Sequence, residues 1–482
     1  MDFRPILMIV GTLLATLALV MCVPAVVDAF QGNPDWEVFA ASAGVTLFLG
    51  VAMALTATTG GVRSLTVRQA FVMTTLSWVA LTVFASFPFM FSERDLSFTD
   101  AFFEAMSGLT TTGSTILTDL DTLPPGILLW RALLQWLGGI GIIVMAIAIL
   151  PMLKVGGMQL FKIESSDTSE EKIFTALRTV VALFTIYAGL TVLCAVLYEV
   201  FGMTPFDAAT HAMTTLSTGG YSTHDESFAY FKDARLHWIA TAFMIAGSIP
   251  FMLYIKTVRG NLSALGNDQQ VRGFLGFLVL ASLGMAVWLA MERNIDFFEA
   301  LTLTAFNITS VVTTTGFASD DYTAWGPGAV GMFLVLMFVG GCSGSTSGAI
   351  KIYRHQILLL LVRAHIKRLF SPNRVIPLRY NGKPLPQDVP YSVLSFMAVF
   401  VATIAGFTVL LSLLGLDIQT AYSASITAVT NVGPGIGDII GPAGNFASLP
   451  VAAKWLLTVA MLAGRLEILA LLVAFDPDFW RA

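Results

Sequence analysis

The sequence is poor in charged residues and in cysteine. Asp, Glu, Lys and Arg together make up 12% of its 482 residues, whereas hydrophobic residues make up 56%. Soluble domains carry about 25% charged residues, so this composition excludes an ordinary soluble domain. The three cysteines lie in or beside apolar segments, which argues against a disulfide framework and against a metal site with cysteine ligands. We therefore predict a polytopic protein embedded in the lipid bilayer.

Histidine is scarce as well. The five histidines show none of the spacings that are typical of a metal site. The formal net charge of −5 says little in a membrane protein, where the position of the basic residues matters more. We expect no covalently bound cofactor, no nucleic-acid partner and no enzymatic activity.

Long apolar runs, by contrast, are plentiful. A helix that crosses a bilayer needs about 20 apolar residues. Ten segments are predicted to span, namely 5–28, 36–59, 69–91, 126–153, 178–202, 236–258, 272–291, 328–362, 390–414 and 449–475. The first is too long for the core of a signal peptide and is expected to be retained. The eighth is overlong and contains a polar break.

Four shorter segments, each followed by a polar loop that ends in glycine, alternate with the spans. The segments are 98–110, 205–216, 296–313 and 418–430, and the loops end at Gly113, Gly219, Gly316 and Gly433. They are too short or too polar to span alone, so they fit re-entrant half-helices. Four copies of one unit are harder to dismiss as chance than a single loop would be.

The predicted fold is therefore an all-α polytopic membrane protein. Two lead spans precede four repeats of span, re-entrant pore helix and span, which surround a pseudo-fourfold pore. The expected divisions are a lead at 1–62 and repeats at 63–155, 156–260, 261–370 and 371–482. With a cytoplasmic N-terminus, 19 of the 26 basic residues fall inside, as the positive-inside rule requires, and all four loops face outward.

The glycine loops have the composition of an ion filter. A cation that crosses lipid needs substitutes for its hydration shell, and inward-pointing backbone carbonyls can provide them. Glycine permits the backbone torsions that such a loop needs, and preceding Thr or Ser residues can add hydroxyl ligands. The alternative is that each Thr-Gly pair only makes a tight turn or a helix contact. Four similarly placed loops favour the filter.

A second polar stretch interrupts the eighth span. Its residues are Gly340, Gly341, Cys342, Ser343, Gly344, Ser345, Thr346, Ser347, Gly348 and Ala349. A break at membrane depth is tolerated where it lines a cavity, so a flexible loop here, below a filter, could close the pore. The alternative is a close helix-packing face of small residues.

Arg465 lies inside the last predicted span. An ionisable residue at this depth is costly and is a functional candidate. Its distance from the outer end of the span places it below the filter, near the stretch 340–349. A structural pair with Glu467 is the alternative, but residues two apart point to different faces of a helix.

These motifs resemble the Trk/Ktr/HKT superfamily of potassium transporters, most closely its bacterial TrkH type. The glycine loops, the closing Asn431–Gly435 stretch, the two-span lead and the 340–351 stretch carry the resemblance, which covers essentially the whole chain. It implies potassium as the transported ion, a homodimer with one pore per subunit, and a bacterial inner-membrane location. It also implies a cytosolic TrkA-like regulatory subunit, which would bind the nucleotide.

The resemblance also assigns roles to residues. The filter residues carried over by position are Thr111, Thr112, Gly113, Ser217, Thr218, Gly219, Thr314, Thr315, Gly316, Asn431, Val432 and Gly433. In related plant members, a serine at the first filter glycine accompanies sodium preference, so Gly113 favours potassium. The fourth loop lacks the Thr-Thr pair, which leaves backbone contacts there. The stretch 340–348 becomes a gating loop, and Arg465 becomes a pore-facing barrier that helps to hold it.

Two other functional classes compete with a channel-like pore. A secondary transporter that couples potassium to proton or sodium movement would also use broken helices, although its repeats are usually paired and inverted. An intramembrane serine protease is a remote alternative, because Gly341-Cys342-Ser343-Gly344 matches a Gly-x-Ser-Gly motif. That chemistry needs a base within reach of the serine, and His355 lies beyond the break on the inner side.

Overall fold

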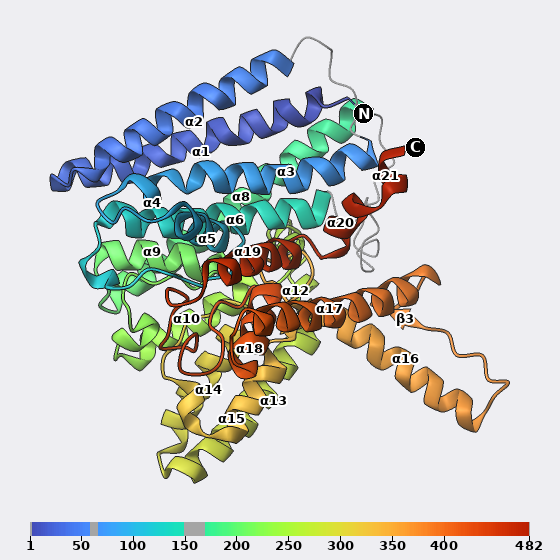
Figure 1. Ribbon diagram of the computed structural model, residues 1–482. Coiled ribbons are helices and arrows are strands. Elements are labelled where there is room, and N and C mark those ends of the chain that lie inside the picture. Colours follow the sequence, from blue (N-terminus) through green and yellow to red (C-terminus); the bar gives the residue numbers. More distant parts are fainter. Residues whose placement is uncertain (1, 58–65, 149–168, 482) are drawn as a thin grey trace.

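The computed structural model describes residues 2–57, 66–148 and 169–481. Helices dominate these residues (Figure 1). Seven of the described helices are long and apolar enough to cross a membrane, or nine if each of two bent pairs is one span. The predicted all-α polytopic membrane fold is therefore confirmed. The strands in the described part of the chain form two short ladders, β1 (Val339–Gly340) parallel to β2 (Ile350–Lys351) and β3 (Arg379–Tyr380) antiparallel to β4 (Lys383–Pro384).

The lead consists of α1 (Arg4–Gln31) and α2 (Asp35–Ala57), which lie side by side at one edge of the molecule (Figure 1). The two helices approach closely where Gly11 faces Gly50, because a Cβ on either glycine would collide with the backbone of the other helix. Small residues permit this kind of contact between membrane helices. The lead is tied to the first repeat by Asp28, whose Oδ1 accepts a hydrogen bond from the amide of Gly126 at 2.7 Å.

Four helical repeats follow the lead. The first has α3 (Val67–Ala85), α4 (Phe87–Phe91), α5 (Phe98–Leu109), η2 (Leu120–Thr122) and α6 (Pro125–Ala148). The second has α8 (Ser169–Val200), α9 (Pro205–Leu216), η4 (Ser227–Tyr230), α10 (Ala234–Gly247) and α11 (Phe251–Val258). The third has α12 (Ala264–Asn267), α13 (Gln269–Arg293), α14 (Phe297–Val312), η5 (Tyr322–Trp325), α15 (Pro327–Leu336) and α16 (Ile352–Phe370). The fourth has α17 (Asp388–Leu413), α18 (Ile418–Thr430), α19 (Val451–Arg465), α20 (Leu469–Leu472), η6 (Val473–Phe475) and α21 (Pro477–Arg481).

The pore helices α5, α9, α14 and α18 match the four predicted half-helices. Each begins with a side chain that accepts a hydrogen bond from a backbone amide of the first turn. The capping residues are Ser97, Thr204, Asp296 and Asp417. Such caps satisfy amides that have no partner within the helix. The sequence therefore starts all four short helices by the same local device.

Besides the eighth predicted span, which is interrupted between α15 and α16, two predicted spans are not continuous helices. The segment 236–258 bends by 91° between α10 and α11, and the segment 449–475 bends by 105° between α19 and α20. At the first bend, Pro250 has no amide hydrogen to continue the helix, and the freed carbonyl of Ser248 accepts the amide of Cys342 at 3.0 Å. At the second bend, Glu467 and Ile468 adopt positive φ values of 62° and 44°. Both bends lie beside the stretch 340–349.

Contacts between segments far apart in the sequence close the repeats into a ring. The pore helix α5 of the first repeat packs against α6 and also against α19 of the last repeat. Similarly, α9 contacts α6, and α14 contacts α10. In contrast, α16 projects away from this body as an arm (Figure 1). The expected divisions at 62/63 and 155/156 lie outside the described residues.

Candidate functional site

The four pore helices end in the same backbone conformation. One residue of each loop adopts a left-handed conformation, and a glycine with positive φ follows two residues later. The left-handed residues are Thr111, Thr218, Thr314 and Asn431, with φ between 50° and 60°. The glycines are Gly113, Gly220, Gly316 and Gly433, with φ of 85°, 77°, 85° and 104°. The loops are thus four copies of one structure.

This comparison corrects the predicted register of the second loop. Thr218, Gly219 and Gly220 correspond to Thr111, Thr112 and Gly113, so the predicted set Ser217, Thr218 and Gly219 begins one residue too early. The backbone hydrogen bonds support the same register. The amide of Gly219 donates to the carbonyl of Thr214, five residues earlier, and the amide of Thr112 likewise donates to the carbonyl of Ser107. The consecutive pair Gly219-Gly220 left both registers open in the sequence. Gly220 is therefore a site residue that the sequence prediction missed.

The four loops form a closed ring. A Cβ on each of the four glycines would collide with a carbonyl oxygen of the next loop: Gly113 with Gly219, Gly220 with Thr315, Gly316 with Val432, and Gly433 with Thr112. The order runs from the first repeat to the fourth and back to the first. Glycine is required at these positions because the neighbouring backbone leaves no room for a side chain. Carbonyl oxygens from all four loops consequently gather around one axis.

The ring separates two small cavities. The cavity on the side of Arg131 and His224, which the predicted topology makes the outer side, has a volume of 70 Å³ and is lined by all four ring glycines. The inner one has a volume of only 20 Å³. One water molecule needs about 10–15 Å³ measured in this way, so the inner cavity has room for roughly one. The ring is therefore open toward one side and nearly closed on the other.

The stretch 340–349 closes the inner side. It connects β1 to β2, and hydrogen bonds join it to residues where the second, third and fourth pore helices end. The amide of Gly348 bonds to Thr314 Oγ1 at 2.6 Å, and the amide of Ala349 bonds to the carbonyl of Thr430 at 2.8 Å. Thr346 Oγ1 bonds to the carbonyl of Leu216 at 3.1 Å. The stretch therefore crosses directly beneath the ring.

Arg465 lies against this loop. Its Nη1 donates to the carbonyl of Thr346 at 3.0 Å, while its Nε and Nη2 have no hydrogen-bond partner among the described residues. Glu467 instead pairs with Arg354 of α16 at 2.6 Å, which agrees with the expectation that it does not pair with Arg465. Lys351 is also buried here, and its Nζ donates to the carbonyl of Ser347. Positive charge thus gathers on the inner side of the ring.

Several predicted hydroxyl ligands have protein partners. Thr112 and Thr315 share hydrogen bonds with Thr110 and Thr313, at 2.7 and 2.8 Å. Thr218 donates to the backbone of Ser217 and to Thr346. The side-chain Nδ2 of Asn431 donates to Thr112 Oγ1 at 2.9 Å and to the carbonyl of Met461 at 3.0 Å. The backbone carbonyls are therefore better placed than these hydroxyls to face an ion.

Sequence reasoning also missed the side chains that support the ring. Arg131 lies in the predicted span 126–153 and was not identified as a site residue, but it is buried and pairs with Glu104 of α5 at 2.9 Å. Gln135 of α6 donates to the carbonyl of Gly219 at 2.7 Å. An arginine within an apolar segment was the available signal, as it was for Arg465.

Comparisons with known proteins agree with this architecture. The chain is 49% identical to the Trk system potassium uptake protein TrkI of Halomonas elongata over 480 residues, covering 99% of this chain and 97% of that protein. It is 35% identical to the Trk system potassium uptake protein TrkH of Escherichia coli, over the full length of both. The crystal structure of the potassium transporter TrkH from Vibrio parahaemolyticus matches with a TM-score of 0.91 at 35% identity and covers all of both chains. The TrkH family profile, described as a cation transport protein, matches residues 37–481. The chain therefore belongs to the TrkH family of cation transport proteins.

Proposed function

We propose that this protein takes up potassium across the cell membrane through a gated, channel-like pore. The observation that carries the proposal is the closed ring of four loops, in which each glycine abuts a carbonyl of the next loop. Such a ring can replace the hydration shell of a cation that fits it. The names of the relatives, which are potassium uptake proteins, support potassium as the ion. The presence of glycine at all four ring positions is consistent with that choice.

The filter residues follow from the ring. We assign ion contact to the backbone of Thr111–Gly113, Thr218–Gly220, Thr314–Gly316 and Asn431–Gly433. The pore helices end at these loops, so the negative ends of their dipoles point toward a bound cation. Ser217 lies one residue before its loop and supports it. The proposed function is therefore transport rather than catalysis.

The stretch 340–349 is the proposed gate. Hydrogen bonds to the ends of three of the four pore helices hold it below the ring, and the cavity left beside it is 20 Å³. Arg465 holds the loop through Thr346 and adds a positive charge that opposes the passage of a cation. Opening requires the loop to move aside, and its C-terminal end continues through β2 into α16.

We further propose that the protein lies in a bacterial inner membrane with its N-terminus in the cytoplasm. Its cytoplasmic side, the inner face, is the proposed surface for partner proteins. The arm α16 carries exposed Leu369 and Phe370 beside Lys367 and Arg368. A chain that exposes such residues has a surface suited to a second copy of itself. The charged inner surface is suited to a cytosolic, nucleotide-binding TrkA-like subunit.

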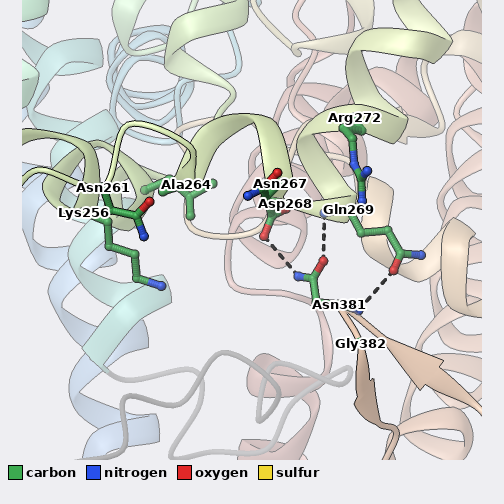
Figure 2. Close-up of a pocket in the computed structure, with 10 residues that line it drawn as sticks. Lys256, Asn261, Ala264, Asn267, Asp268, Gln269, Arg272, Asn381 and Gly382 are labelled. Carbon is green, nitrogen blue, oxygen red and sulfur yellow. Dashed lines mark hydrogen bonds between the residues drawn. The ribbon is translucent and has the colours of Figure 1, made fainter.

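A surface pocket lies where the β3–β4 hairpin, which follows the arm α16 in the chain, meets the body of the protein. It has a volume of 300 Å³ and lies between α11, α12, the start of α13 and the turn of the β3–β4 hairpin (Figure 2). The amide of Gln269 donates to Asn381 Oδ1 at 2.8 Å, and the amide of Asn381 donates to Gln269 Oε1 at 3.1 Å. A partner that binds here would contact the segment that follows α16, the helix whose N-terminal end continues from the proposed gate. This is a route by which a cytosolic subunit could regulate flux.

The test is cation flux into liposomes that contain the purified protein, with a variant shortened within 344–348 to relieve the gate. Potassium or rubidium should enter down its own electrochemical gradient, and sodium should enter much more slowly. The unmodified protein should show low flux until its cytosolic partner is added. If the shortened variant and the partner-bound protein move potassium only when a proton or sodium gradient is supplied, the protein is a coupled transporter and the channel proposal is wrong.

A further inference from the structure

One position in the pore helices has a different side chain in every repeat. It lies two helical turns before the left-handed residue of each loop and is occupied by Glu104, His211, Asn307 and Ala424. The first three side chains reach the segment that leaves their own loop. This segment is not part of a β-sheet, and we call it the outgoing strand. Glu104 accepts the amide of Ile116 at 3.0 Å, Asn307 accepts the amide of Ser319 at 3.2 Å, and His211 bonds to Ser222 Oγ at 3.0 Å. This position therefore supports the outgoing half of the ring.

Glu104 differs from the others because it is a carboxylate that is fully buried in an ion pair. Its Oε1 accepts Arg131 Nε at 2.9 Å and Thr115 Oγ1 at 3.0 Å, and its Oε2 accepts the amide of Ile116. The outgoing strand of the first loop is thus held to its own pore helix by hydrogen bonds to a carboxylate. Hydrogen bonds to an ionised group are shorter and stronger than neutral ones.

Arg131 extends this support to the second repeat. Its Nη1 donates to the carbonyl of Ser222 at 2.8 Å, and its Nη2 donates to Thr115 Oγ1 at 3.2 Å. Its guanidinium lies 4.1 Å from the ring centre of Tyr221. One planar group therefore holds the strands that leave two neighbouring loops, directly outside Gly113 and Gly220. A guanidinium suits this task because its donors form a rigid fork.

Three more hydrogen bonds carry the support to the ring itself. Tyr221 donates its hydroxyl to the carbonyl of Glu104 at 3.0 Å, and its amide donates to Gln135 Oε1 at 3.0 Å. Gln135 then donates to the carbonyl of Gly219, the oxygen that abuts Gly113. Arg131 and Gln135 are four residues apart on α6 and so share a face of the helix. The chain of contacts runs from the ion pair to a ring oxygen.

We propose that Glu104 and Arg131 are a positioning pair for ion selectivity. They hold the outgoing strands of the first and second loops together and so set the spacing of the Thr112 and Gly219 carbonyl oxygens. The proposal rests on the proposed potassium filter. It predicts that loss of the pair changes the discrimination between potassium and sodium, because a looser ring no longer favours an ion of one size.

The test uses E104Q, which preserves the shape of the side chain but removes its charge. The potassium-to-sodium permeability ratio, measured from reversal potentials in a gate-shortened background, should fall about tenfold, which corresponds to about 1.4 kcal/mol. R131K should lower the ratio as well, because a single ammonium cannot serve Glu104, Ser222 and Thr115 with the same fork. D100N is the matched control, since it breaks the 2.6 Å pair between Lys454 and Asp100 on the same pore helix without a contact to the ring. Its ratio should equal that of the parent protein.

The outcomes separate this proposal from the filter itself. If E104Q lowers potassium and sodium flux equally and leaves the ratio unchanged, the pair is only structural and the proposal is overturned. If E104Q does not fold, the double variant E104Q/R131M, which removes both buried charges, takes its place with the same expected fall in the ratio. G316S is the positive control. A normal ratio in G316S would overturn the filter assignment, whereas a low ratio in G316S with a normal one in E104Q or the double variant would overturn the pair alone.

Discussion

At the scale of single residues, the ring glycines have the least freedom to change. Gly316 has a φ of 85°, and a Cβ there would collide with the carbonyl oxygen of Val432 and lie 2.8 Å from Pro434 Cδ. A substitution must therefore displace the fourth loop from the third. The same argument holds around the ring, so a change at one glycine is felt by the carbonyl of the next repeat.

We predict that G316S lowers the preference for potassium over sodium by about tenfold or more, equivalent to at least about 1.4 kcal/mol. The serine side chain pushes Val432 outward, and the ring loses the spacing that suits one ion. Reversal potentials in mixed potassium and sodium solutions measure the effect. G331S is the control, because a Cβ at Gly331 of α15 has open space around it. An unchanged preference in G316S would remove the third loop from the filter.

His224 offers a prediction about pH at the outer mouth. Its Nδ1 lies 2.5 Å from Asp121 Oδ1 and its Nε2 lies 3.5 Å from Asp207 Oδ1. Burial lowers the pKa of His224, but its interactions with Asp207 and Asp121 raise it, and the net effect is a pKa above the ordinary value of 6.5. The protonated form is therefore favoured in the folded protein.

The sign of the pH dependence follows from this raised pKa. The stabilisation by His224 is fully present below pH 6.5 and is lost as the pH rises through the higher pKa of the folded protein. The melting temperature of the purified protein should therefore exceed that of H224N most clearly in acid, and the difference should shrink as the pH rises. H365N, at an exposed position of α16, serves as the control. A difference that grows with pH would contradict the assigned pairs.

At the scale of elements, the broken helices and the loop 340–349 form one unit. The bend after α10 frees the carbonyls of Gly247 and Ser248, which accept the amides of Thr346 and Cys342. The bend after α19 places Arg465 against Thr346 and Glu467 against Arg354 of α16. Backbone groups without helical partners are tolerated at membrane depth when other protein groups satisfy them. Each break therefore depends on the loop, and the loop depends on both breaks.

We predict that R465A raises basal potassium flux in the absence of a partner. The substitution removes a charged hydrogen bond that holds Thr346, worth about 1.5–3 kcal/mol, and removes a positive charge from the path. An increase of about tenfold or more is expected in liposome flux measurements. R465K retains the charge and should raise flux less. Flux at the parental level in R465A, with normal expression, would remove Arg465 from the gate.

At the scale of the whole molecule, the ring is made by pairs of segments that are distant in the chain. Gly433 of the fourth loop abuts Thr112 of the first, and Ser114 donates to the carbonyl of Gly433 at 2.9 Å. The first pore helix also packs against α19. The ring is therefore complete only when the first and the fourth repeats meet. The arm α16 is the exception, because it leaves this closed body (Figure 1). Residues at its end, such as Arg368, Leu369 and Phe370, are exposed.

Much of this organisation is determined by the sequence alone. Apolar length predicts spans, and the caps and glycines mark the start and end of the four pore helices, because these signals depend on local backbone chemistry. The polar stretch 340–349 and the charge of Arg465 stand out for the same reason, since both are unusual within an apolar segment. The family resemblance rests on these local features.

Only the tertiary structure decided how the local features meet. The register of the second loop depends on which of two adjacent glycines faces Thr315, and that contact belongs to another repeat. The bends at Pro250 and Glu467 exist because their free backbone and side-chain groups find partners in the loop and in α16. Arg131 is buried and supports the ring because Glu104 and Ser222 accept its hydrogen bonds. Such pairings join segments far apart in the chain, and apolar periodicity carries no information about them.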